Sequence, residues 1–299
     1  MSWQLAVVLR VIVAHGLCQY LIKKTAIKHC RTERFLWQFF FCVLIASVFM
    51  LISGGLKVDN TFLLIVVVGF FNGLAAYFSW KAIAISLSRT SLFTFWDDII
   101  TLGLGYLILG EVKFLNPGVV VGVLMSLTAV VVFAIINYRR SSNDSTKNHL
   151  PMKFFVFVGM YSVIWGVAVF AMRYWVLSGV SLPVFGFGLY LGALISATLI
   201  FLFYKDGGQD QQAVTKLTRR DITVTLVLAI LVFTALVLGY IGYRGAPITV
   251  LQPIFLSSEM IIPSLIGLFI FHERKQFEKV DWVCFGLGLA GAMTVVWSF

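Results

Sequence analysis

Long apolar runs separated by short polar stretches form the pattern along this chain. Ten runs reach or approach the roughly 20 residues that a helix needs to cross the hydrocarbon core of a bilayer. They are residues 3–22, 35–56, 61–80, 90–110, 116–137, 154–177, 181–204, 222–243, 247–271 and 280–298. The runs are continuous and lack the alternation of membrane-barrel strands, which favours helices. We therefore expect an all-α membrane protein with ten transmembrane helices.

Composition strengthens this expectation. Hydrophobic residues make up 60% of the chain and charged residues 12%, whereas a soluble globular protein has about 25% charged residues. So few polar residues could not cover the apolar surface in water. We expect a multi-pass protein of the cell (inner or plasma) membrane, in contact with membrane lipid. The four cysteines are scattered without metal-binding spacing, so neither a metal site nor another cofactor is expected.

The net charge of +10 comes from bases in alternate loops rather than from a basic domain, so nucleic-acid binding is not expected. One set of loops holds most of the Lys and Arg residues, while the opposite loops hold Lys57 and Lys113. Bases accumulate on the cytoplasmic side of a membrane protein. The base-rich loops include Lys23, Arg34, Arg89, Arg139, Arg140, Arg219, Arg220 and Arg274. With ten spans, this bias places both termini outside.

The two halves of the chain resemble each other. A shift of 162 residues places Glu111 on Glu273 and Asp97 on Glu259. With five spans in each half, the two copies must have opposite topology, as in transporters built from inverted repeats. We therefore predict a first five-helix repeat over residues 1–137, a cytoplasmic linker over 138–153 and a second, inverted five-helix repeat over 154–299.

These features resemble the drug/metabolite transporter superfamily, in its EamA-like branch, over the whole chain. The motifs that carry the resemblance are Trp165-Gly166, Leu109-Gly110-Glu111 followed by Gly118 and Gly122, and His272-Glu273 followed by Gly286, Gly288 and Gly291. The chain departs from the pattern at His15-Gly16, where Trp-Gly is usual, and at Val280, where glycine is usual. The resemblance implies transport but leaves the substrate open, since the family carries amino acids, nucleotide sugars, drugs and other metabolites. Its members often have cytoplasmic termini, which the loop charges here oppose.

Acids within the spans are the first candidates for function, because an ionisable group at membrane depth costs about 2.5 kcal/mol or more. Asp97, Asp98 and Glu259 are expected to exchange protons, and Asp97 and Glu259 also to bind substrate. Thr90, Thr94, Asp97 and Thr101 share one helix face, which we interpret as a cavity wall. The alternative is a structural pairing of each acid with a base or hydroxyl on a neighbouring helix.

Other polar and aromatic residues within the spans complete the expected substrate site. They are Arg10, His15, Gln19, Asn72, Trp165, Tyr190 and Gln252. Arg10 suits a carboxylate or phosphate, or it could neutralise Asp97 or Asp98. His15 could titrate or stay neutral between helices, and each aromatic residue could equally be core or lipid-facing.

Four charged residues near span ends are candidate gates: Lys81, Glu111, Arg244 and Glu273. Snorkelling to the interface is the alternative for the two bases, and helix-end solvation or a hairpin role is the alternative for the two glutamates. Glycine pairs such as Gly69 and Gly73 allow close helix packing, compatible with a monomer or a homodimer.

The function expected is secondary active transport of a small polar or amphipathic metabolite, an amino acid or organic anion, by an exporter or exchanger working by alternating access. No catalytic or nucleotide-binding motif is present, so we expect neither an enzyme nor ATP-driven transport. Protons are the candidate coupling ion. The alternative is a proton-coupled exporter of hydrophobic cations or drugs, and an intramembrane enzyme or lipid flippase is a third possibility.

Overall fold

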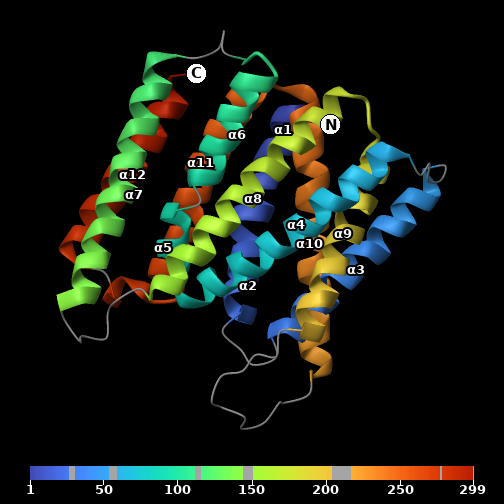
Figure 1. The fold of residues 1–299 in the computed structure, drawn as a ribbon, viewed down its shortest axis with the longest axis horizontal. Helices are drawn as coiled ribbons and strands as arrows, with labels where there is room; N and C mark the ends of the chain where they lie inside the picture. Colours follow the sequence, from blue (N-terminus) through green and yellow to red (C-terminus); the bar gives the residue numbers. More distant parts are fainter. Residues whose placement is uncertain are drawn as a thin grey trace. The chain divides into compact units, whose positions relative to one another are not determined.

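The fold is taken from a computed structural model that describes residues 1–26, 31–53, 59–93, 95–111, 116–143, 151–203, 217–276 and 278–298. Throughout these residues the regular structure is helical, and each of the ten apolar runs forms helix (Figure 1). The elements are α1 Trp3–Arg10, η1 Val11–Cys18, α2 Gln19–Ala26, α3 Arg31–Ile52, α4 Asn60–Ile85, α5 Leu87–Phe93, α6 Phe95–Ile108, α7 Pro117–Asn143, α8 Met152–Leu177, α9 Leu182–Phe203, α10 Arg219–Gly245, α11 Ile248–Leu265, η3 Ile266–Ile270, η4 Glu273–Gln276 and α12 Lys279–Trp297.

Eight helical stretches in the described part of the chain are long and apolar enough to cross a membrane. They are Trp3–Thr25, Thr32–Ile52, Asn60–Ile85, Leu87–Ile108, Met152–Leu177, Leu182–Phe203, Arg219–Gly245 and Ile248–Ile270. The expectation of an all-α, multi-pass membrane protein is thus confirmed at this level. The fifth and tenth runs form α7 and α12, and ten complete spans remain a prediction.

Among the described residues, two spans contain a π-helical segment. Residues Val11–Cys18 form η1 between α1 and α2, and Ile266–Ile270 form η3 after α11. Pro263 lies just before η3 within α11. Proline removes one backbone donor and displaces the preceding turn, which favours a wider turn nearby.

The chain forms two compact units, each assembled from both halves of the sequence. Unit 1 comprises Met1–Trp80 and Ala171–Gly245, and unit 2 comprises Lys81–Phe170 and Ala246–Phe299. In unit 1, α3 packs against α9 and α10, and α1 packs against α10. In unit 2, α5, α6 and α12 pack against α11, and α7 packs against α12.

Small residues set the close helix packing in unit 1. A Cβ added at Gly69 would lie 2.2 Å from the Leu189 carbonyl oxygen, and one at Gly192 would lie 2.0 Å from that of Val66. Neither position could hold a side chain without separating α4 from α9. Glycine spacing here therefore serves packing within one chain.

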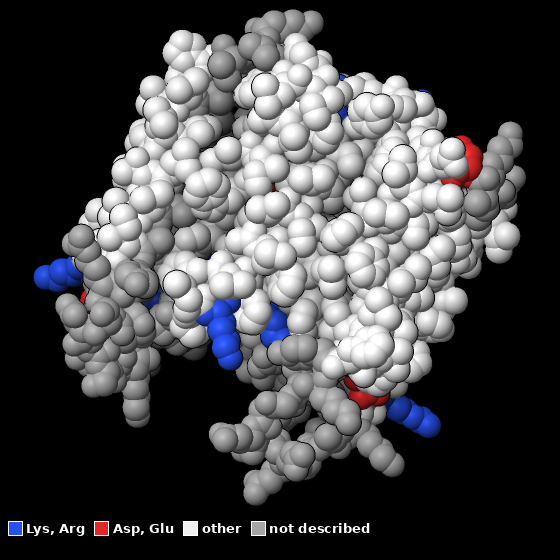
Figure 2. Space-filling view, viewed as in Figure 1, with Lys and Arg blue, Asp and Glu red and all other residues white. Residues whose placement is uncertain are grey.

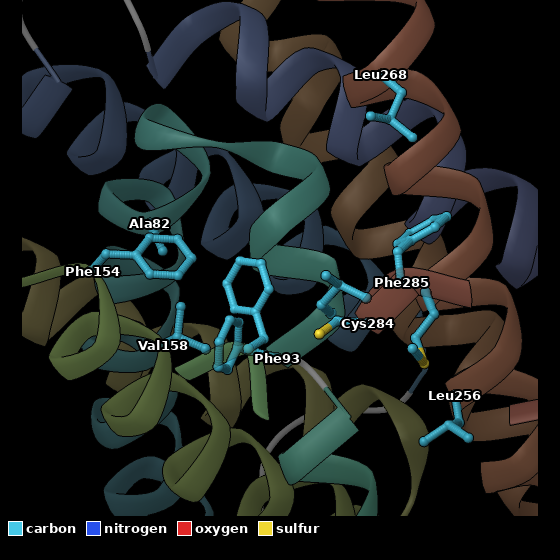
Figure 3. Packing of buried hydrophobic residues seen from close by; sticks show 11 residues of the cluster. Ala82, Phe93, Phe154, Val158, Leu256, Leu268, Cys284 and Phe285 are labelled. Atoms are coloured by element: carbon cyan, nitrogen blue, oxygen red, sulfur yellow. The ribbon is translucent and has the colours of Figure 1, made fainter. Parts of the chain in front are cut away.

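Aromatic and aliphatic side chains fill the core of unit 2 (Figure 3). Phe93 of α5 contacts Phe133 of α7 and Phe154 of α8, with ring centroids 5.6 and 5.8 Å apart. Leu256, Cys284 and Phe285 from α11 and α12 belong to the same buried cluster. This core packs against α5 and α11. The buried acids lie in α6, which follows α5, and in α11 itself.

On the face shown in Figure 2, most described residues are neither acidic nor basic, and few Lys and Arg side chains are visible. Three bases that the sequence analysis assigned to loops, Lys23, Arg34 and Arg89, are instead buried in helices. The two arginines form ion pairs. Arg34 of α3 forms an ion pair with Asp221 of α10, and Arg89 of α5 forms one with Asp281 of α12 at 3.2 Å. Their charges are matched within the protein, so they are weaker indicators of orientation than bases in open loops.

Candidate functional site

Three carboxylates are buried together in unit 2. Asp97 and Asp98 lie in α6 and Glu259 lies in α11, with 1%, 1% and 8% of their surfaces exposed. The two helices pack against each other, and Asp97 interacts electrostatically with both Asp98 and Glu259. We call these three residues the acid cluster.

Two neighbouring side chains hold members of the acid cluster. The Gln252 side-chain amide of α11 donates a hydrogen bond to Asp98 Oδ1. The Tyr161 hydroxyl of α8 lies 3.4 Å from Glu259 Oε1 and donates to it. The ring of Tyr161 also stacks on that of Trp165, with centroids 6.1 Å apart, so aromatic surface adjoins the carboxylates.

Asp97 is the acid of the cluster whose side chain receives neither the Gln252 nor the Tyr161 hydrogen bond. Its Oδ1 atom is buried and has no hydrogen-bond partner among the described residues. A buried acceptor without a partner loses the hydrogen bonds that water would supply, which costs about 1–3 kcal/mol and more when the group is charged. Asp97 Oδ1 is thus an open position for a donor, and Asp98, which accepts from Gln252 through Oδ1, has a second buried oxygen, Oδ2, that accepts no hydrogen bond from the described residues.

A close contact between α6 and α8 fixes the position of the Asp97 backbone against α8. The Thr101 hydroxyl donates to the backbone oxygens of Asp97 at 2.8 Å and Gly166 at 2.9 Å. A Cβ on Gly166 would lie 2.6 Å from the Asp97 carbonyl oxygen. The glycine of Trp165-Gly166 therefore permits this contact, and Thr101 serves it rather than lining a cavity. Thr90 likewise bonds the Ser86 carbonyl, and Thr94 lies outside the described residues.

Each of the two candidate gate glutamates accepts hydrogen bonds from groups at the start of another helix. Glu273 accepts hydrogen bonds from the backbone N–H groups of Leu87 and Ser88, both at 2.9 Å, and from the Ser86 hydroxyl at 2.9 Å. Glu111 accepts one from the backbone N–H of Thr249 at 3.2 Å. These contacts agree with the helix-end alternative and leave the gating role a prediction.

The contacts of Glu111 and Glu273 are related to each other by the 162-residue shift between the two halves of the sequence. Glu111 and Glu273 are 162 residues apart, as are Leu87 and Thr249. The Ser126 hydroxyl of α7 also donates at 3.2 Å to the carbonyl of Gly288, its own counterpart under the same shift. In unit 2, these hydrogen bonds therefore either occur in pairs related by the 162-residue shift or join a residue to its own counterpart.

Unit 1 contains the other group of expected substrate residues. Arg10, His15, Asn72 and Tyr190 are buried, and Gln19 is half-buried. The Arg10 guanidinium lies 5.8 Å from the centre of the Tyr243 ring, and its Nε atom is 3.1 Å from where a Gly239 Cβ would be. Arg10 also interacts electrostatically with His15. The Tyr190 hydroxyl donates to the Val232 carbonyl at 3.1 Å, which is a structural contact.

The remaining gate candidates lie at helix ends. Lys81 is half-buried in α4, and Arg244 is exposed at the end of α10. Exposure of Arg244 agrees with the snorkelling alternative. The sequence analysis missed the Arg89–Asp281 pair and the contact of Tyr161 with Glu259, because both depend on how distant helices pack.

No metal site is found among the described residues. No group of three or more His, Cys, Asp or Glu side chains there has an arrangement that could hold a metal ion. Cys18, Cys42 and Cys284 are buried free thiols, and Cys30 lies outside the described residues. The acid cluster thus brings carboxylates near one another without the convergence that metal ligands show.

Comparisons with known proteins establish the fold alone. No family model matches the chain, and no curated protein matches its sequence. A solved structure described only as "Crystal structure of protein" aligns with 97% of this chain and 93% of its own, with a TM-score of 0.62 and 15% sequence identity. The arrangement of helices is therefore one that occurs in an experimentally determined protein.

Proposed function

We propose that this protein is a secondary active transporter of a small polar or amphipathic metabolite. The observation that carries the proposal is the acid cluster: three buried carboxylates in candidate membrane spans, with an open acceptor atom on Asp97. Ionisable groups at membrane depth are costly and usually mark a transport or proton pathway. An enzyme is a weaker explanation, because the sequence contains no catalytic motif.

The exchanged contacts of unit 2 support an inverted repeat. In a pair of repeats related by a two-fold axis, a contact between positions i and j has a mate in which each position is replaced by its counterpart. The Glu111–Thr249 and Glu273–Leu87 bonds are such mates. A contact between counterparts, as between Ser126 and Gly288, belongs on the axis itself. Transporters of this design work by alternating access.

The finer features of the proposal follow the sequence. We propose membership of the EamA-like drug/metabolite transporters, repeats over 1–137 and 154–299, and a location in the cell membrane with both termini outside. Without a nucleotide-binding motif, an ion gradient or exchange must drive the transport. The sequence places both acids and bases within the apolar runs, which favours an amino acid or organic anion as the substrate of an exporter or exchanger.

A proton-coupled exporter of hydrophobic cations is a second candidate. The stacked rings of Tyr161 and Trp165 beside Glu259 favour it, because aromatic faces and carboxylates together bind organic cations. Flux of a cationic dye, with no flux of amino acids, would select this candidate over the first.

Reconstitution tests transport itself. Purified protein is screened by thermal shift against amino acids, organic anions and cationic dyes, and each stabilising compound is then followed into proteoliposomes. Saturable flux above that of empty liposomes is expected for at least one of them. Compounds that bind and stabilise the protein, yet cross no faster than through empty liposomes, would contradict the proposal.

A further inference from the structure

The acid cluster offers a specific kind of acceptor. Glu259 accepts from Tyr161, and Asp98 accepts from Gln252. Asp97 Oδ1 is buried and has no hydrogen-bond partner among the described residues. A ligand that enters this cluster therefore meets an open oxygen on Asp97, with Asp98 Oδ2 as a second buried oxygen that accepts no described hydrogen bond. Asp98 and Glu259 are already held through their other bonds to Gln252 and Tyr161.

The chemistry of the surroundings restricts that ligand. A group that donates hydrogen bonds and carries positive charge would satisfy Asp97 and offset the repulsion among the three acids. A bare metal ion fits poorly, since the described acids do not converge as metal ligands. The Tyr161 hydroxyl contacts Glu259, and the Tyr161 ring stacks on that of Trp165; aromatic faces attract organic cations.

We propose that the acid cluster binds the ammonium group of an organic substrate, with Asp97 Oδ1 as its direct acceptor. This inference rests on the proposed transport function and adds the substrate class to it: a molecule bearing a protonated amine. The N–H groups donate to Asp97, and the carbon atoms next to the nitrogen lie against aromatic surface. An organic anion that lacks an amine is not a substrate on this account.

Protection from a carboxyl reagent tests the inference without measuring transport. Dicyclohexylcarbodiimide reacts with carboxyl groups in apolar surroundings, and peptide mass spectrometry locates the modified residue. Purified full-length protein is labelled with and without benzylammonium, benzyl alcohol, benzoate or Na⁺. At ten times its Kd a ligand leaves about one site in eleven open, so benzylammonium should slow labelling of the acid cluster about tenfold.

Two variants make the test specific. Asp97→Asn keeps the shape of the side chain but removes its charge, so benzylammonium should no longer protect Asp98 or Glu259. Glu278→Gln changes an exposed acid of unit 2 and should leave protection intact. Should Asp97→Asn fail to fold, Asp97→Glu retains the charge and is expected to retain protection.

Results with the other compounds can contradict the inference. Equal protection by benzyl alcohol would show an apolar pocket without charge recognition. Protection by Na⁺ alone would assign the acid cluster to an inorganic ion, and labelling unaffected by every compound would remove the binding site. Because the measurement is of binding, protection without flux would contradict the transporter and leave the ammonium site standing. Flux of a substrate that has no amine, together with no protection by benzylammonium, would support the transporter and contradict the ammonium site.

Discussion

The carboxylate of Glu273 accepts a hydrogen bond from the backbone N–H of Leu87 at 2.9 Å. The counterparts of these two residues, 162 positions away, are Glu111 and Thr249, which form the same contact at 3.2 Å. The first turn of a helix has N–H groups without partners in the helix, and a carboxylate there satisfies them and interacts favourably with the helix dipole. Each half of the chain thus provides the acid for a helix start in the other half.

Replacing Glu273 should destabilise the fold. Glu273→Ala leaves the Leu87 and Ser88 N–H groups and the Ser86 hydroxyl buried without this acceptor, at a cost of about 1–3 kcal/mol. Thermal unfolding in detergent is the measurement, with Glu278→Ala as the control because Glu278 is exposed. Equal unfolding temperatures for the two variants would contradict the capping role.

A pair of glycines on α8 tests the contact that places Asp97. Gly166→Ala would put a Cβ 2.6 Å from the Asp97 carbonyl oxygen, whereas a Cβ at Gly159 meets nothing within 4 Å. Overpacking of this kind costs about 1–3 kcal/mol. Gly159→Ala should be neutral or slightly stabilising. If both variants unfold alike, α6 and α8 do not meet as described.

The buried ion pair between Arg89 and Asp281 gives a third prediction. Removing one partner leaves an uncompensated buried charge, so Asp281→Asn or Arg89→Met should lower the free energy of unfolding by about 3–5 kcal/mol. The double variant should lose less than the sum of the two single losses, which a double-mutant cycle in detergent measures. If Arg89 were instead an exposed loop base, each single variant would lower the free energy of unfolding by less than about 0.5 kcal/mol and the two losses would add, which would contradict the buried ion pair.

Several features of the fold could be predicted from the sequence because they depend on local pattern. Apolar runs of spanning length became helices, and Asn116 caps α7, since the Gly118 N–H donates to its side chain at 2.8 Å. Burial of Asp97 and Glu259 followed from their depth within apolar runs. These outcomes need only the period and length of a helix.

Other features could not be predicted, because they depend on the register between distant helices. The pairing of Gln252 with Asp98 and of Tyr161 with Glu259 requires knowing how α11 meets α6 and α8. Arg89 was assigned to a loop because it lies between the apolar runs 61–80 and 90–110, yet a residue of α12 neutralises it. The π-helical segments carry no distinct sequence signal, although Pro263 lies close to one of them.

The central claim is that the buried carboxylate of Asp97 acts in transport rather than in folding. The most direct test is the initial rate of substrate uptake by Asp97→Asn in proteoliposomes, normalised to correctly inserted protein. We predict a fall of at least about tenfold, equivalent to about 1.4 kcal/mol, with an unfolding temperature close to that of the unaltered protein. Uptake at the rate of the unaltered protein would contradict the account.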